Sequence, residues 1–187
     1  MPYVSKIKQT MKKQKIPAEI ISQLPDPKDV NNPEAIIAFF NQMDKLLSRE
    51  QCLSIMEQQG CSKTDTVAKP FREFGQKYAD RTIEEKIEQL FDELQTGHKA
   101  PCRVNPDGTL SIYWAHEEKG KVRCVCRQRK GLSGQVSLTF CGCCGGHVRF
   151  TYQQALGVNL RLKEIVSSSL KSNGEKRCEF LFEIVNA

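Results

Sequence analysis

The hydrophobic residues of this chain change their spacing near residue 97, and that change limits the folds the chain can adopt. Before it, apolar residues recur every three or four positions, as on one face of a helix. After it, short stretches alternate between apolar and polar residues, as in strands with one buried face. We therefore predict an α+β fold, in which an N-terminal helical layer packs on a C-terminal antiparallel sheet.

The first half predicts a series of helices. Asn32 and Pro33 form a start signal for a broadly apolar helix, and Thr82 with Glu85 has the spacing of a capping box. Gly60 and Gly97 are expected to end helices. The expected helices cover about residues 4–11, 17–24, 33–47, 49–59, 67–78 and 82–94.

The second half predicts strands and one helix. Residues 119–127 and 135–140 are expected to pair as a hairpin, and glycines between positions 142 and 146 to interrupt the second strand. A helix is expected over residues 148–156, ended by Gly157. Further strands are expected over residues 109–114, 159–170 and 177–185, the last two joined by a turn at 172–174.

Charge and cysteine content also change near residue 97. Residues 1–97 hold 14 basic and 15 acidic side chains, whereas residues 98–187 hold 14 basic and 7 acidic ones and seven of the nine cysteines. We predict a helical region over 1–97 and a cysteine-rich α+β region over 98–187, together one compact unit. The odd number of clustered cysteines favours thiol or metal chemistry in a reducing compartment over a disulfide scaffold. With no signal peptide or apolar run long enough to cross a bilayer, a cytoplasmic location is expected.

The main candidate site is a cysteine cluster. Two cysteines separated by one residue would lie on the same face of a strand, and the expected hairpin would bring them near a second group. Four thiolates, or three and an imidazole, form a closed tetrahedral zinc site, which makes zinc the expected ion and an iron–sulfur cluster the alternative. The candidate ligands are Cys124, Cys126, Cys141, Cys143, Cys144 and His147.

Two other interpretations of these cysteines remain open. Cys141 and Cys144 precede a predicted helix, whose positive end would lower a thiol pKa, so either could be a nucleophile or redox centre with His147 as base. Alternatively, they are buried reduced thiols that pack as small hydrophobic residues. Cys102 is a possible fifth ligand, and the remaining cysteines are expected in the core.

The C-terminal third resembles a known family. A Cys-Gly-rich segment leads into the helix at 145–150, and the last strand has glycine at 174, Cys178, Phe180 and Phe182 in the pattern G-x-x-x-C-x-F-x-F. This is similar to the L-2-amino-thiazoline-4-carboxylic acid hydrolase-like family, whose fold is of the 4-vinyl reductase type, and to an uncharacterised cysteine-rich subgroup within it. The resemblance implies a small-molecule pocket between helices and sheet, and a hydrolase by name. From its strand position alone, Cys178 is expected to be a core residue.

Basic residues gather on the expected hairpin, and they suggest a possible partner. They could attract an anionic small molecule such as a carboxylate, or neutralise the phosphates of a nucleic acid. Few aromatic side chains are near enough to stack on bases, which disfavours nucleic acid. The residues are Lys119, Lys121, Arg123, Arg127, Arg129 and Lys130. The function predicted from all these features is a metal-stabilised, small-molecule-binding protein.

Overall fold

The computed structural model shows an α+β protein, and it describes residues 2–26, 32–60, 63–94, 102–114, 116–118, 120–126, 131–132 and 135–185. Six of the seven helices in the described residues precede the sheet, as the spacing of apolar residues predicts. They are α1 (Pro2–Lys13), α2 (Ala18–Ser22), α3 (Pro33–Leu46), α4 (Arg49–Glu57), α5 (Asp65–Lys77) and α6 (Ile83–Leu94). The seventh helix, α7 (Gly142–Leu156), follows the first strands.

The main sheet has four strands in the order β1-β2-β6-β5, and all neighbouring strands are antiparallel. The two longest strands come from the end of the chain and pair with each other. The strands are β1 (Cys102–Val104), β2 (Leu110–Trp114), β5 (Asn159–Ser167) and β6 (Cys178–Val185). A separate hairpin is formed by β3 (His116–Glu118) and β4 (Lys121–Arg123).

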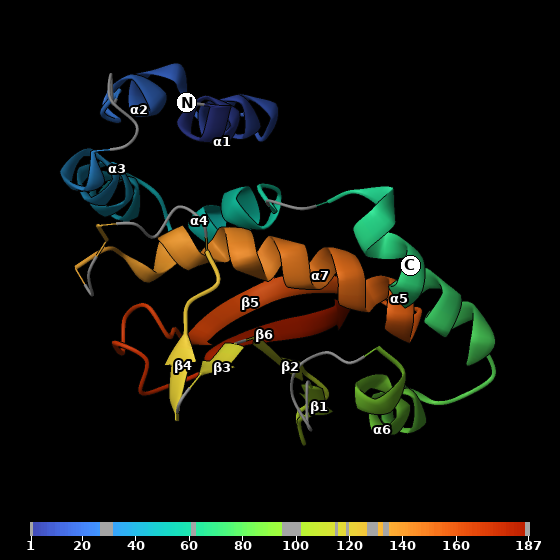
Figure 1. Cartoon of the computed structure of the whole chain (residues 1–187). Coiled ribbons are helices and arrows are strands. Elements are labelled where there is room, and N and C mark those ends of the chain that lie inside the picture. The colour runs from blue at the N-terminus through green and yellow to red at the C-terminus, as the bar shows by residue number, and fades with distance from the viewer. Residues whose placement is uncertain are drawn as a thin grey trace.

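Helix α7 lies between the sheet and helices α1 to α5, while α6 lies beside β1 (Figure 1). It crosses the face of β5 and β6, while α4 and α5 pack on it from outside, and α1 to α3 lie farther from the sheet. One continuous buried core joins the helical half to the sheet. The largest fully buried side chains include Phe39 and Phe40 of α3, Tyr152 of α7, and Phe180 and Phe182 of β6. The alternating burial of β6 confirms that one sheet face meets the helices and the other is more open.

Local sequence signals account for several helix boundaries. The Asn32 side chain accepts a hydrogen bond from the Glu34 N–H at the start of α3, next to Pro33. Thr82 and Glu85 form the expected capping box, because each side chain bonds the other residue's backbone N–H, at 3.2 and 2.8 Å. The expected turn before β6 is also present, with Asn173 and Gly174 both at positive φ.

The predicted hairpin of 119–127 with 135–140 is wrong. Residues 121–123 pair with 116–118 instead, residues 124–126 lie outside any strand, and Leu138–Cys141 form a short 3-10 helix, η2. The β-rich composition of 135–140 is overridden by tertiary contacts. The Thr139 hydroxyl donates to the Asp44 carboxylate at 2.6 Å and is itself completely buried.

The prediction that the glycines between positions 142 and 146 interrupt secondary structure is also wrong. These glycines lie inside α7, which begins at Gly142 rather than near residue 148. Glycine is a poor helix former, and sequence alone therefore favours a break there. Close packing on both sides of α7 explains why glycine occurs at these positions.

Candidate metal site

The first turn of α7 is held close to both of its neighbours by glycines. A Cβ atom at Gly146 would lie 2.1 Å from the Glu57 carbonyl oxygen of α4. On the other side, a Cβ at Gly145 would lie 2.8 Å from Leu162 Cδ2 of β5. Only hydrogen fits at these two positions, so the cysteines of this turn lie in a tightly packed, water-poor part of the molecule.

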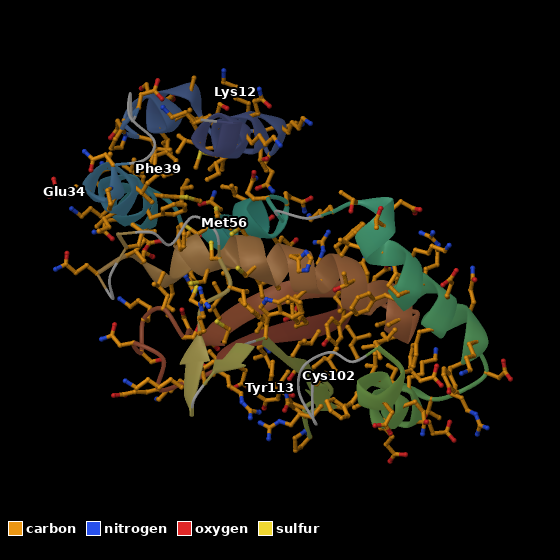
Figure 2. The ribbon with its side chains drawn as sticks, in the orientation of Figure 1. Lys12, Glu34, Phe39, Met56, Cys102 and Tyr113 are labelled. Atoms are coloured by element: carbon orange, nitrogen blue, oxygen red, sulfur yellow. The ribbon has the colours of Figure 1, made fainter. Side chains whose placement is uncertain are left out.

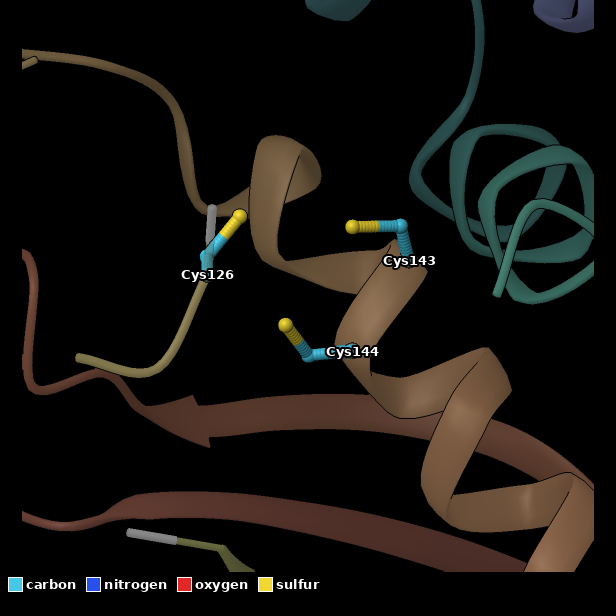
Figure 3. Close-up of side chains that lie close together, drawn as sticks. All are labelled: Cys126, Cys143 and Cys144. Atoms are coloured by element: carbon cyan, nitrogen blue, oxygen red, sulfur yellow. The ribbon is translucent and has the colours of Figure 1, made fainter. Parts of the chain in front are cut away.

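Three cysteines meet beside this turn. The sulfur atoms of Cys126, Cys143 and Cys144 all lie within 4.8 Å of one another. Figure 3 shows the three side chains directed toward a common space, two from α7 and one from the irregular segment after β4. Cys126 and Cys143 are buried and Cys144 is partly buried. Three soft ligands converging from two segments in this way could hold a metal ion.

Two thiols in this region, those of Cys144 and Cys141, favour the neutral form. The neighbouring thiols of Cys126 and Cys143 and the burial of Cys144 raise the pKa of Cys144 well above its usual range. Burial raises the pKa of Cys141 to about 12. A nucleophilic thiol requires the opposite shift. The electrostatics therefore favour a site that ionises when a cation binds over one that holds a reactive thiolate at neutral pH.

The other predicted ligands, Cys124, Cys141 and His147, do not belong to this 4.8 Å group. Cys141 ends η2, directly before α7, and its Sγ lies 3.2 Å from Ser168 Oγ. Cys124 is partly buried, two residues before Cys126. The His147 ring is one turn along α7 and packs edge-on against Trp114, with ring centroids 5.3 Å apart.

Two of the predicted basic residues, Lys121 and Arg123, lie exposed on β4. The other four, Lys119, Arg127, Arg129 and Lys130, lie outside the described residues, as do Cys61 and His98.

Cys102 is not close to the cluster. It lies on β1, away from the start of α7 (Figure 2). Burial alone raises its pKa to about 12. Cys52 is 1% exposed in α4, and its thiol lies 3.8 Å from the Met43 carbonyl oxygen, as expected for a core residue.

Sequence reasoning did not find the side chains that position the site. Asp44, at the end of α3, accepts hydrogen bonds from the hydroxyls of Ser137 and Thr139, and Arg49 donates to Thr139 at 3.0 Å. These bonds fix η2, and therefore the entry to α7, against the N-terminal helices. No local pattern reveals them, because the partners are about 90 residues apart in the chain.

A second anchor is the buried carboxylate of Glu57 in α4, which is 5% exposed. One oxygen is paired with Arg149 of α7 at 2.5 Å, and the other accepts the Leu162 N–H of β5 at 2.9 Å. The carboxylate thus joins α4, α7 and β5. The only signal in the sequence is an acidic residue beside an apolar face, which is common in surface helices.

An open hollow of about 420 Å³ lies at the other end of α7. It is lined by Gln153, Gln154 and Gly157 of the helix end, by the start of β5, and by the end of β6. It lies where helix and sheet meet, which is where the family resemblance places a ligand.

No family model, curated protein or solved structure matches this chain. The resemblance to the amino-thiazoline hydrolase-like family therefore stays a prediction. None of the helices in the described residues is both long enough and apolar enough to cross a membrane.

Proposed function

We propose that this chain is a zinc-stabilised protein in which the thiolates of Cys126, Cys143 and Cys144 hold the ion. The observation that carries the proposal is the 4.8 Å grouping of the three sulfurs in a packed region. Zinc is bound by thiolates in tetrahedral geometry, with Zn–S distances of about 2.3 Å, so sulfurs around one ion lie roughly 3.8 Å apart. Small side-chain rotations bring the three sulfurs to that spacing.

The fourth ligand would come from Cys141, Cys124 or His147. Of these, Cys141 is supported by its position directly before the helix that carries two of the other ligands. An iron–sulfur cluster needs four thiolates at the same place and is therefore the less favoured alternative. If the protein supplies all four ligands, the zinc ion is structural, because no coordination position stays open for a substrate.

The ion would stabilise the fold by joining the irregular segment at residues 124–126 to the first turn of α7. Residues 124–126 have no strand partner, and α7 is the central helix. Binding at this point would fix the irregular segment on the start of α7, and binding energy of this kind adds directly to the free energy of unfolding.

Small-molecule binding is the second part of the proposal, and the hollow at the end of α7 favours it. The amide side chains of Gln153, Gln154 and Asn159 offer both donors and acceptors there, next to the apolar side chains of Val158 and Ile184. A compact polar molecule, such as a small carboxylate, suits this lining. Hydrolysis of a thiazoline ring rests on the family resemblance alone.

Site-resolved alkylation tests the zinc proposal. The purified, reduced chain is treated with a thiol reagent with and without a strong chelator, and the labelled cysteines are identified by peptide mass spectrometry. We expect Cys126, Cys143 and Cys144 to be protected with zinc and labelled after chelation, because loss of the ion releases the segment that carries Cys126 from the start of α7. Cys102 is as buried as Cys143 but lies outside the site, so it should stay unlabelled in both cases. Equal labelling of the three cysteines with and without chelator would refute the proposal.

A further inference from the structure

The three-cysteine cluster brings together three sulfur atoms and no fourth ligand. The sulfurs of Cys126, Cys143 and Cys144 lie within 4.8 Å of one another, and among the described residues no further cysteine, histidine or carboxylate joins this group. The thiol of Cys141, directly before α7, lies 3.2 Å from Ser168 Oγ and outside the group. The site as it is built therefore suits a centre that takes three sulfur ligands.

The backbone that carries the two cysteines of α7 is held in place by its neighbours. A Cβ atom at Gly142 would lie 2.6 Å from Met56 Cβ, and one at Gly146 would lie 2.1 Å from the Glu57 carbonyl oxygen. The first turn of α7 therefore has no room to move toward α4. Residues 124–126 have no strand partner, so the site can close around a bound centre by movement of this segment and by rotation of the three side chains.

The net charge of the bound site depends on which ion enters it. Three thiolates leave one negative charge with Zn²⁺ and two with Cu⁺, whereas they exactly balance a trivalent ion. Cys126 is 8% exposed and Cys143 is 3% exposed, so a net charge here would lie mostly out of water. Burying an unbalanced charge costs free energy. The cluster therefore favours a soft trivalent centre that binds three sulfurs and needs no further ligand.

We propose that the three-cysteine cluster also binds trivalent arsenic, supplied as arsenite, through Cys126, Cys143 and Cys144. Arsenite at neutral pH is As(OH)₃. Three As–O bonds and three S–H bonds break, three As–S bonds form, and three water molecules leave. Arsenic stays trivalent and no electron is transferred. This inference shares its three thiols with the proposed zinc site, but it does not require that zinc binds.

The exposure of the three thiols gives arsenite a way in. Cys144 is partly exposed, whereas Cys126 and Cys143 are buried, so the small neutral molecule reaches Cys144 first. Figure 3 shows the other two sulfurs directed toward the same space. The bond to Cys126 joins the segment at 124–126 to the first turn of α7, so that binding of arsenic links these two parts of the fold.

Native mass spectrometry of the zinc-free, full-length chain, titrated with sodium arsenite, tests this inference. A phosphine keeps the cysteines reduced, because a thiol reductant would itself bind arsenic. In the wild type we expect a single arsenic, with a mass gain of one arsenic atom less three hydrogen atoms. That mass shows that no hydroxyl group stays on arsenic and that three As–S bonds have formed.

Two variants identify the ligands. In Cys126→Ser, arsenic should keep one hydroxyl group, since only two As–S bonds can form, and binding should weaken about a hundredfold. Cys102→Ser is the matched control, because Cys102 is 2% exposed but lies on β1, outside the cluster. It should bind arsenic as the wild type does. The wild-type mass tests the inference whether or not a variant folds.

The outcomes separate this inference from the zinc proposal. A wild-type adduct that keeps a hydroxyl group, or no adduct at all, would overturn arsenic binding by three thiols and leave the zinc proposal to its own alkylation test. Loss of three hydrogen atoms in Cys126→Ser would overturn the assignment of Cys126. The expected arsenic adduct, found in a chain whose cysteines zinc does not protect, would support this inference and refute the zinc proposal.

Discussion

Replacing Gly146 with alanine tests whether close packing of α7 on α4 builds the site. The added Cβ would lie 2.1 Å from the Glu57 carbonyl oxygen and 2.7 Å from its carbonyl carbon. Ordinary contacts between such atoms are about 3.5 Å, so the two helices must separate by about 1.4 Å. A backbone carbonyl in a helix cannot rotate away, as the end of a flexible side chain could.

The expected magnitude follows from three effects. Forcing a methyl group into a packed interface costs about 1–3 kcal/mol. Separation of the helices also weakens the contacts of the Glu57 carboxylate with Arg149 and the Leu162 N–H, at a cost of about 1–3 kcal/mol. Alanine is the better helix former by about 1 kcal/mol, which acts in the opposite direction. We expect Gly146→Ala to lower the free energy of unfolding by about 2–4 kcal/mol.

Urea unfolding, followed by circular dichroism and by the fluorescence of the single tryptophan, measures this change. Gly108→Ala is the matched control, because a Cβ there meets nothing within 4 Å and only the positive φ of 77° is unfavourable, at about 1 kcal/mol. If Gly146→Ala were as stable as the wild type or more stable, helix propensity would dominate and the packing argument would be refuted.

Three further predictions concern the anchors and the buried thiols. Glu57→Gln should lower stability by about 2–3 kcal/mol in the same urea assay, because it removes a buried charge from its ion pair. Asp44→Ala should cost about 1–2 kcal/mol by removing the acceptor of two hydroxyl groups. Stability should fall between pH 9 and 12, because the Cys102 thiol ionises near pH 9 when unfolded and its pKa is about 12 when folded. Cys102→Ala should show a shallower fall.

Controls separate these effects from general ones. Glu183→Gln breaks an exposed pair with Arg161 and should cost less than about 1 kcal/mol. If Glu183→Gln lowered the free energy of unfolding as much as Glu57→Gln, burial of the ion pair would not explain the effect of Glu57→Gln. An Asp44→Ala variant with wild-type stability would show that η2 is held by its apolar contacts alone. An unchanged pH slope in Cys102→Ala would assign the alkaline fall to other groups.

Local signals in the sequence were enough to predict the fold class and most helices. The capping box at Thr82 and the start signal at Asn32 depend on hydrogen bonds within one helical turn, so neighbouring residues are enough to predict them. The alternation of β6 likewise follows from one buried face. These features depend little on distant parts of the chain.

The start of α7 could not be predicted in the same way. Gly145 and Gly146 predict a break in the helix, because glycine is a poor helix former. Their lack of a side chain is, however, what permits close packing of α7 on β5 and α4. The 3-10 helix before them depends on Asp44, far away in the chain. Long-range contacts of this kind overrode the β-rich composition of residues 135–140.

The candidate site was predicted in part. Clustering in the sequence identified Cys126, Cys143 and Cys144 as possible ligands, and their sulfurs come together. The pairing of Cys178 with Trp114 across the sheet could not be predicted from local patterns. That register becomes visible only when the strands are placed.

The central claim, a zinc ion on converging cysteines, is tested most directly by elemental analysis of the untagged chain, purified without added metal, with thiols counted before and after chelation. We expect about one zinc per chain or more, and the release of three or more protected thiols by the chelator. Iron in place of zinc, or no metal and the same thiol count with and without chelator, would contradict it.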